Sequence, residues 1–382
     1  MSWDSVIGQH RVKKILQNAI ARKRVSHAYF FTGQEGIGKD AVAIEFAKAL
    51  NCEGSSTQAC DRCSSCFKFQ TLQHPNVFLV FSLPVGKNEE SGDPPLLKLT
   101  EEDVAIIREQ IALKAKNPYH KITIPKANNI KINSIREIRR ESSRSLFESG
   151  KRIFILFDVD GLNDQASNAL LKTLEEPNDN TMFILTTAYP EKILPTIISR
   201  CQVIQFDNLS EEEIQVALSE RERLEDHRAH LIARFANGNY KRAVQLVHSN
   251  IQEHRDHVIE LLQRSLNQSH QSILQQIEYL CAEYQRSEIE NLLSLLQMWL
   301  HDAMMLSKGN DRVVNADDVS KIRAFVAKFS TVDYPVSFQA VDKAISLLNK
   351  NVYIPLILIQ LSIELRNCIL SNHQSLGATA GR

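Results

Sequence analysis

The sequence lacks an excess of charge of either sign, although charged residues are common in it. Its 382 residues include 45 Lys or Arg and 45 Asp or Glu, so the formal net charge at neutral pH is zero. A protein that binds nucleic acid by itself usually carries a basic surface. The balance therefore argues against an independent nucleic-acid-binding protein and predicts that any contact with DNA is made within a larger assembly.

The sequence also lacks a signal peptide and a run of apolar residues that could cross a membrane. No secretory pattern precedes or includes MSWDSVIGQH at the start. The longest apolar run near the end, YIPLILIQL at 353–361, is too short to span a bilayer. We expect a soluble cytoplasmic protein without membrane contact. In that compartment an odd total of seven cysteines argues against a disulfide framework.

Four of the cysteines are close together in the sequence. Cys52, Cys60, Cys63 and Cys66 follow the pattern C-x7-C-x2-C-x2-C. Two-residue gaps let tight turns aim successive thiolates at one tetrahedral zinc ion. The alternative is a group of buried or incidental thiols, which rarely cluster in this way. The spacing predicts zinc, and a structural one, because four protein ligands leave no open coordination position for catalysis.

Short buried strands alternate with amphipathic helices over residues 1–206. We expect strands at HAYFFTG (27–33), KRIFILFDVD (151–160) and TMFILTTAY (181–189). Helices are expected at 9–24, 40–51, 100–116, 130–145 and 164–177. Such alternation is typical of an α/β fold with a parallel sheet covered by helices.

The remaining segments have a different character. Residues 81–126 look like an insertion, with a loop rich in Pro and Gly followed by a helix that Thr100 caps. A short helical region extends over 208–249, and residues 250–371 are helical without a strand signal. The tail at 372–382 is expected to be disordered.

The stretch FTGQEGIGKD at 31–40 nearly matches the P-loop pattern G-x-x-x-x-G-K-[ST], and it lies between a strand and a helix as a P-loop must. Backbone N–H groups and a helix N-terminus form such a phosphate cradle. The sequence retains the residues that form this cradle, which are Gly33, Gly36, Gly38 and Lys39. Asp40 replaces the Ser or Thr whose hydroxyl holds Mg²⁺.

Asp40 decides what we expect of nucleotide binding. A carboxylate about 4 Å from a phosphate charge costs about 4 kcal/mol at an effective dielectric constant near 20. That corresponds to roughly thousandfold weaker binding, unless Mg²⁺ bridges the two groups. Binding of ATP and Mg²⁺ is therefore expected to be weak or absent.

Several motifs together resemble one family, the AAA+ clamp-loader subunits of bacterial DNA polymerase III. Besides the P-loop and the cysteines that follow its helix, they are WDSVIGQ (3–9), SHAYFFTG (26–33), SNALLKTLEEP (167–177) and ISRCQVIQF (198–206). The resemblance covers most of the chain outside 81–126. It implies an AAA+ P-loop domain at 1–207 with an inserted zinc knuckle, a helical lid domain at 208–249 and an all-α collar domain at 250–371.

The same resemblance assigns further residues to the nucleotide site. Val6 and Ile7 would belong to the base pocket. The Asp-Glu pair of the hydrolysing relatives falls on Phe157 and Asp158 or, with a slip of one residue, on Asp158 and Val159, so neither register is complete. The alternative is that Asp158 and Asp160 merely end a strand.

Three further positions resemble the two sensors and the arginine finger of the family. Thr186 or Thr187 resembles sensor 1, and GNYKRA at 238–243 offers Lys241 or Arg242 as sensor 2, although both could be solvated charges. Arg200 in ISRC resembles the arginine finger that completes a neighbouring subunit's ATP site in trans. An isolated Arg is usually a solvated surface residue, but its place in this motif favours the functional interpretation.

The family contains ATP-hydrolysing gamma and tau subunits and the delta prime subunit, whose own site is commonly degenerate. The altered P-loop and the incomplete Asp-Glu pair favour the delta prime type. This implies a subunit without robust ATPase activity that assembles with gamma/tau and delta subunits and helps load the sliding clamp on primer-template DNA. The alternatives are an active gamma/tau-type ATPase and a DNA-binding regulator, which the zero net charge disfavours.

Overall fold

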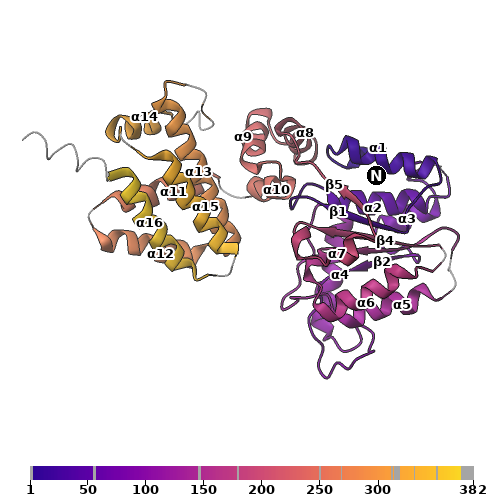
Figure 1. Cartoon of the computed structure of the whole chain (residues 1–382). Coiled ribbons are helices and arrows are strands. Elements are labelled where there is room, and N and C mark those ends of the chain that lie inside the picture. The colour runs from indigo at the N-terminus through magenta and orange to yellow at the C-terminus, as the bar shows by residue number, and fades with distance from the viewer. Residues whose placement is uncertain are drawn as a thin grey trace, which may run out of the picture. The chain divides into compact units, whose positions relative to one another are not determined.

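The computed structural model divides the chain into two compact units, Met1–Val244 and Gln245–Arg382 (Figure 1). The residues that it describes are 3–54, 57–144, 148–178, 180–248, 251–267, 269–310, 313, 319–330, 332–349 and 352–370. The tail that we expect to be disordered, 372–382, lies outside these residues.

A parallel sheet forms the centre of the first unit, as the alternating pattern predicted. Among the described residues it has five strands in the order β2-β3-β4-β1-β5. They are β1 (Ala28–Thr32), β2 (Val77–Val80), β3 (Arg152–Leu156), β4 (Thr181–Thr187) and β5 (Gln202–Gln205). The sequence indicated β1, β3 and β4, which are buried along their whole length. It did not indicate the edge strands β2 and β5, because four residues are too few to show a period.

Helices cover both faces of this sheet (Figure 1). They are α1 (His10–Ala21), α2 (Lys39–Leu50), α3 (Ser64–Phe69), α4 (Glu101–Lys116), α5 (Ile132–Ser142), α6 (Asp164–Glu175) and α7 (Pro195–Ile198). On one face α2 contacts β3 and β4. On the other, Phe154 and Phe183 stack with their centroids 5.5 Å apart and form a core with apolar residues of α5, α6 and α7.

Local signals explain where several helices begin. Thr100 and Asp103 form a capping box at the start of α4, and Asn163 caps α6. The same unit continues into α8 (Glu211–Arg221), α9 (Asp226–Ala236) and the start of α10 (Tyr240–His248). Ser210 and Glu213 form the capping box of α8, which packs on α9.

The described residues of the second unit are helical, in agreement with the pattern. The helices are α11 (Ile251–Leu266), α12 (His270–Glu283), α13 (Arg286–Ser307), α14 (Val319–Lys328), α15 (Tyr334–Asn349) and α16 (Ile354–Leu370). The apolar run YIPLILIQL lies at the start of α16, where Ile357, Leu358 and Leu361 are buried in the unit's core. Within the described part of the chain, no helix combines the length and the apolar character that crossing a membrane requires.

Candidate functional site

The P-loop connects β1 to α2, so its backbone lies at the carboxyl end of the sheet. Gly36 and Gly38 have positive φ angles of 73° and 102°. A Cβ on Gly36 would lie 1.8 Å from Asn239, and one on Gly38 would lie 3.1 Å from Tyr119. Glycine is therefore required for two reasons here, the backbone conformation and the close approach of other segments.

Lys39, the phosphate-binding lysine of the motif, is turned onto its own loop. Its Nζ donates hydrogen bonds to the carbonyl oxygens of Gly33 at 2.7 Å and Gln34 at 2.5 Å. The side chain is buried, and burial lowers the pKa of Lys39. The Gly-rich turn predicted from the sequence is therefore present between β1 and α2, and its lysine is bound to the turn's own carbonyl oxygens.

Asp40 has a partner that the sequence did not indicate. Lys114 of α4 donates to Asp40 Oδ2 at 2.5 Å, and the Thr186 hydroxyl donates to Asp40 Oδ1 at 2.8 Å. Burial tends to raise the pKa of Asp40, but the Lys114 ammonium, together with Lys39 and the Thr186 hydroxyl, holds the pKa below its ordinary value. The sequence argument treated Asp40 as an uncompensated charge facing phosphate, and the ion pair corrects that assumption.

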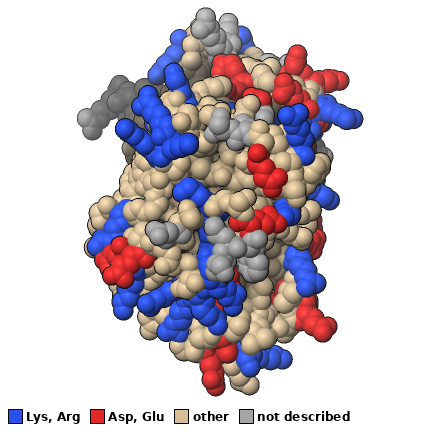
Figure 2. Space-filling model, turned by 90° about the vertical axis from the view of Figure 1, so that its right-hand side faces the viewer, with Lys and Arg blue, Asp and Glu red and all other residues tan. Residues whose placement is uncertain are grey.

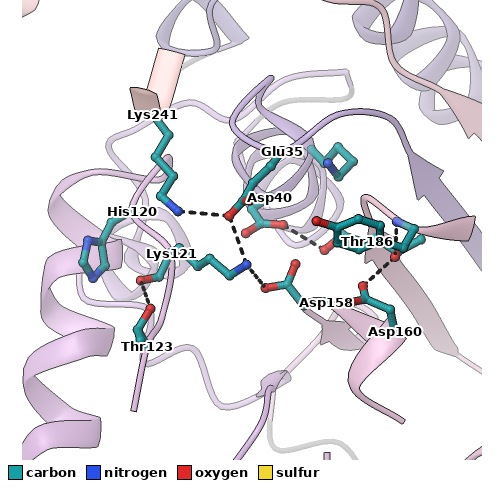
Figure 3. Close-up of polar contacts among 12 residues, drawn as sticks. Glu35, Asp40, His120, Lys121, Thr123, Asp158, Asp160, Thr186 and Lys241 are labelled. Carbon is teal, nitrogen blue, oxygen red and sulfur yellow. Dashed lines mark hydrogen bonds and ion pairs between the residues drawn. The ribbon is translucent and has the colours of Figure 1, made fainter. Parts of the chain in front are cut away.

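Lys121 is the centre of a second group of charges (Figure 3). Its Nζ lies 3.0 Å from Glu35 and 3.5 Å from Asp158, while Lys241 of α10 lies 2.9 Å from Glu35. Burial would raise the pKa of Glu35, but Lys121 and Lys241 lower it to about 2. Burial and the neighbouring Asp40 raise the pKa of Asp158. Glu35 and Asp158 therefore both face lysines of the same chain, which outweigh burial at Glu35 but not at Asp158.

Tyr119 closes the cavity on the side of the expected base pocket. The backbone N–H of Ile7 donates to its hydroxyl at 2.7 Å, and its ring contacts Tyr240 with centroids 4.9 Å apart. Val6, Ile7 and Tyr119 are all buried. The structure thus brings the predicted base-pocket residues against a side chain of the insertion.

The space that remains is small. A cavity of about 40 Å³ lies among P-loop residues, Tyr119, Lys121, Asp158 and Lys241, and a second one of about 210 Å³ lies beyond Lys121 and Asp40. Pockets that bind drug-sized ligands measure about 300–1,000 Å³. In this conformation the residues present do not fit a nucleoside triphosphate with Mg²⁺.

The predicted metal-handling and sensing positions divide between two clusters. Asp158 follows β3 and faces Lys121, whereas Phe157 is buried beneath the Lys114 ammonium, 4.6 Å from its ring centroid. Val159 is buried as well. Asp160 accepts a hydrogen bond from the Thr187 hydroxyl at 2.6 Å. Neither register of the expected Asp-Glu pair supplies a glutamate.

For each of the two sensors, the sequence left two candidate residues, and the structure places the two candidates in different surroundings. Thr186 contacts Asp40 directly, and Thr187 contacts Asp160 instead. Lys241 lines the small cavity beside the P-loop, whereas Arg242 does not. Their sensing roles remain predictions.

Arg200 lies elsewhere, in the turn between α7 and β5. Its guanidinium donates to Glu175 at 2.7 Å and to the carbonyl oxygen of Thr196 at 2.9 Å. The side chain is 35% exposed and does not line the P-loop cavity. Arg200 therefore has no contact with the chain's own P-loop cavity, and its role as an arginine finger remains a prediction.

The four cysteines predicted to bind zinc lie together around the start of α3. The sulfurs of Cys52, Cys60, Cys63 and Cys66 are within 4.8 Å of one another, and those of Cys60 and Cys66 are 4.0 Å apart. Zn–S bonds of about 2.3 Å in a tetrahedron place sulfurs about 3.8 Å apart. The donor set fits a closed structural zinc site, in which the metal would join Cys52 and Cys60 to α3.

The comparison with known proteins decides the family. The model described as "DNA polymerase III, delta subunit" matches residues 8–210. The chain belongs to this family.

Relatives of this family member include DNA polymerase III subunit delta' of Bacillus subtilis strain 168, which is 28% identical over 347 residues. The alignment covers 90% of this chain and 92% of that protein. DNA polymerase III subunit tau of the same organism is 32% identical over 251 residues, covering 64% of this chain and 37% of that protein. The tau subunit of Escherichia coli K12 is 28% identical over 252 residues, 64% of this chain and 32% of that protein.

In this member of the delta-subunit family, the insertion supplies the site residues that sequence reasoning missed. Lys114, Tyr119 and Lys121 all lie in the segment 81–126, which the sequence marked only as additional to the fold. Polar residues in a loop and a half-exposed helix give no signal of the partners that they contact. Glu35 stood inside the P-loop motif, but nothing in the motif indicates that two lysines bind it.

Replacing Cys63 with Ser is expected to release the zinc. A hydroxyl is a poor substitute for a thiolate ligand, and Cys63 Sγ also accepts the Cys66 backbone N–H at the start of α3. Elemental analysis should then fall from one zinc per chain toward none, and limited proteolysis should cleave faster between residues 52 and 66. Cys281→Ser, in the second unit, is the matched control and should keep its metal. Full zinc occupancy in the Cys63→Ser protein would refute the assignment.

Proposed function

We propose that this chain is a clamp-loader subunit of the DNA polymerase III holoenzyme, of the delta prime type, and that it contributes to DNA replication without hydrolysing ATP itself. The observation that carries this proposal is the P-loop cavity, where Asp40 and the other carboxylates are paired with the chain's own lysines. The delta' relative, aligned over 90% of this chain, supports the subunit type. The gamma/tau-type ATPase, the alternative, requires a cavity that admits nucleotide.

The role toward neighbouring subunits rests on Arg200. Its guanidinium is held by exposed contacts, and exposed ion pairs contribute only about 0–1 kcal/mol. The side chain can therefore leave Glu175 for a more strongly charged partner. A γ-phosphate in a neighbour's site matches the planar guanidinium fork, which stabilises the charge of the transition state. Arg200 would act in trans in this way.

The partners follow from the same proposal. The chain would assemble in the cytoplasm with gamma/tau and delta subunits through its AAA+ and collar domains. It would meet the sliding clamp and primer-template DNA as part of that complex. Figure 2 shows blue and red side chains on the same face of the molecule, with the blue ones gathered most densely at the lower left. The zero net charge of the whole chain favours contacts through an assembly over independent DNA binding.

Reconstitution tests this function. The isolated chain should show ATPase activity near background, whereas a mixture with gamma/tau and delta should need the chain for clamp loading and for ATPase activity stimulated by DNA and clamp. Hydrolysis by the isolated chain at the rate of the gamma/tau subunits would favour the alternative. Salt-sensitive DNA binding by the isolated chain would instead favour a DNA-binding regulator.

A further inference from the structure

We infer that residues 114–121 form a plug, an internal segment that occupies the chain's own P-loop site in place of nucleotide and Mg²⁺. Within the first unit, the plug connects the sheet to helices α8 and α10. This inference goes beyond the proposed function and does not depend on Arg200, because it concerns the chain's own cavity.

The first argument is charge. Asp40 stands in place of the P-loop hydroxyl that would hold Mg²⁺, Asp158 follows β3, and each faces a lysine of the plug. Lys114 lies 2.5 Å from Asp40, and Lys121 lies 3.5 Å from Asp158. Two ammonium groups thus supply the positive charge that a divalent cation would supply there.

The second argument is space. The Tyr119 ring lies over Gly38, where phosphate would approach the backbone, and only 6% of Tyr119 is exposed. Lys121 lines both the cavity of about 40 Å³ and that of about 210 Å³, so it stands between them. Figure 3 shows its side chain reaching between Glu35 and Asp158. Nucleotide could enter only after the plug had moved.

The third argument is connectivity. The Tyr119 hydroxyl accepts the Ile7 N–H, and its ring contacts both Tyr240 of α10 and, at 5.7 Å, the guanidinium of Arg221 in α8. Glu35 of the P-loop binds Lys121 and Lys241 together. One short segment therefore bridges the N-terminal residues, the P-loop and the helices after the sheet. These parts of the first unit are held together without a bound nucleotide.

A pair of variants tests the plug on the full chain. The open variant carries Asp40→Ser, Lys114→Ala, Tyr119→Ala and Lys121→Ala, and the matched control carries Asp40→Ser and Lys114→Ala only. The probe is a fluorescent ATP analogue titrated with excess Mg²⁺. We expect no saturable binding by the wild type, little by the control and binding at least about tenfold tighter by the open variant than by the control.

Two outcomes would overturn the inference. The first is micromolar binding by the wild type. The second is a folded open variant that binds no better than the control. Circular dichroism and zinc content establish that each variant is folded.

Amide hydrogen exchange on the wild type needs no variant and covers the case in which the open variant fails to fold. The Ile7 amide, which donates to Tyr119, should exchange slowly and remain unchanged in millimolar MgATP. Rapid exchange without nucleotide, or protection that appears only with MgATP, would show that the plug does not hold the site.

Discussion

Arg200→Ala is expected to lower ATP hydrolysis by up to roughly a thousandfold at the one neighbouring site that Arg200 completes, since arginine fingers contribute about this much. The whole reconstituted complex should lose less, because other interfaces carry their own arginines. The chain itself should stay folded and assembled. Its stability should change by less than about 0.5 kcal/mol, because the side chain contacts only exposed partners. The measurement is ATPase activity stimulated by DNA and clamp, together with clamp loading.

Two further variants separate a finger from a surface charge. Arg200→Lys should restore little activity, because an ammonium lacks the planar fork of the guanidinium. Glu175→Gln weakens the intramolecular partner and leaves the guanidinium intact, so its rates should stay near those of the wild type. Unchanged rates for Arg200→Ala in a fully assembled complex would place the finger elsewhere.

Asp40→Ala is expected to destabilise the first unit by about 3–5 kcal/mol, the usual cost of leaving one member of a buried ion pair without its partner. The Lys114 ammonium is only 1% exposed, and without Asp40 it would keep the His120 carbonyl oxygen but no carboxylate at hydrogen-bond distance. Thr186 would lose the acceptor of its hydroxyl as well. The double change Asp40→Ala/Lys114→Met should recover most of the loss, because it removes both charges.

Urea unfolding of Asp40→Ala, of Lys114→Met and of the double variant gives the coupling free energy between the two residues directly. Asp40→Asn is the matched control, because it keeps an acceptor for Thr186 and removes the charge. A change of less than about 0.5 kcal/mol for Asp40→Ala would show that the pair with Lys114 contributes nothing. The sequence argument, which considered only repulsion between Asp40 and phosphate, offers no reason for a loss of stability.

Local patterns in the sequence were sufficient for much of the fold. The buried strand and the Gly-rich turn before α2 predicted the P-loop, and Thr100 predicted the start of α4. The spacing of the four cysteines predicted that their sulfurs converge. These features depend on residues a few positions apart, whose relation follows from turn and helix geometry.

Only the tertiary structure decided the character of the nucleotide site. Asp40 and Lys114 are 74 positions apart in the sequence, and Lys121 is 86 positions from Glu35. Residues of a local motif are never so far apart. No periodicity or spacing in the sequence relates such residues, because the path of the insertion across the carboxyl end of the sheet sets their separation. The sequence by itself determined a P-loop with an altered metal position. That Asp40 and Asp158 pair with Lys114 and Lys121 depends on long-range packing and was visible only once the chain was folded.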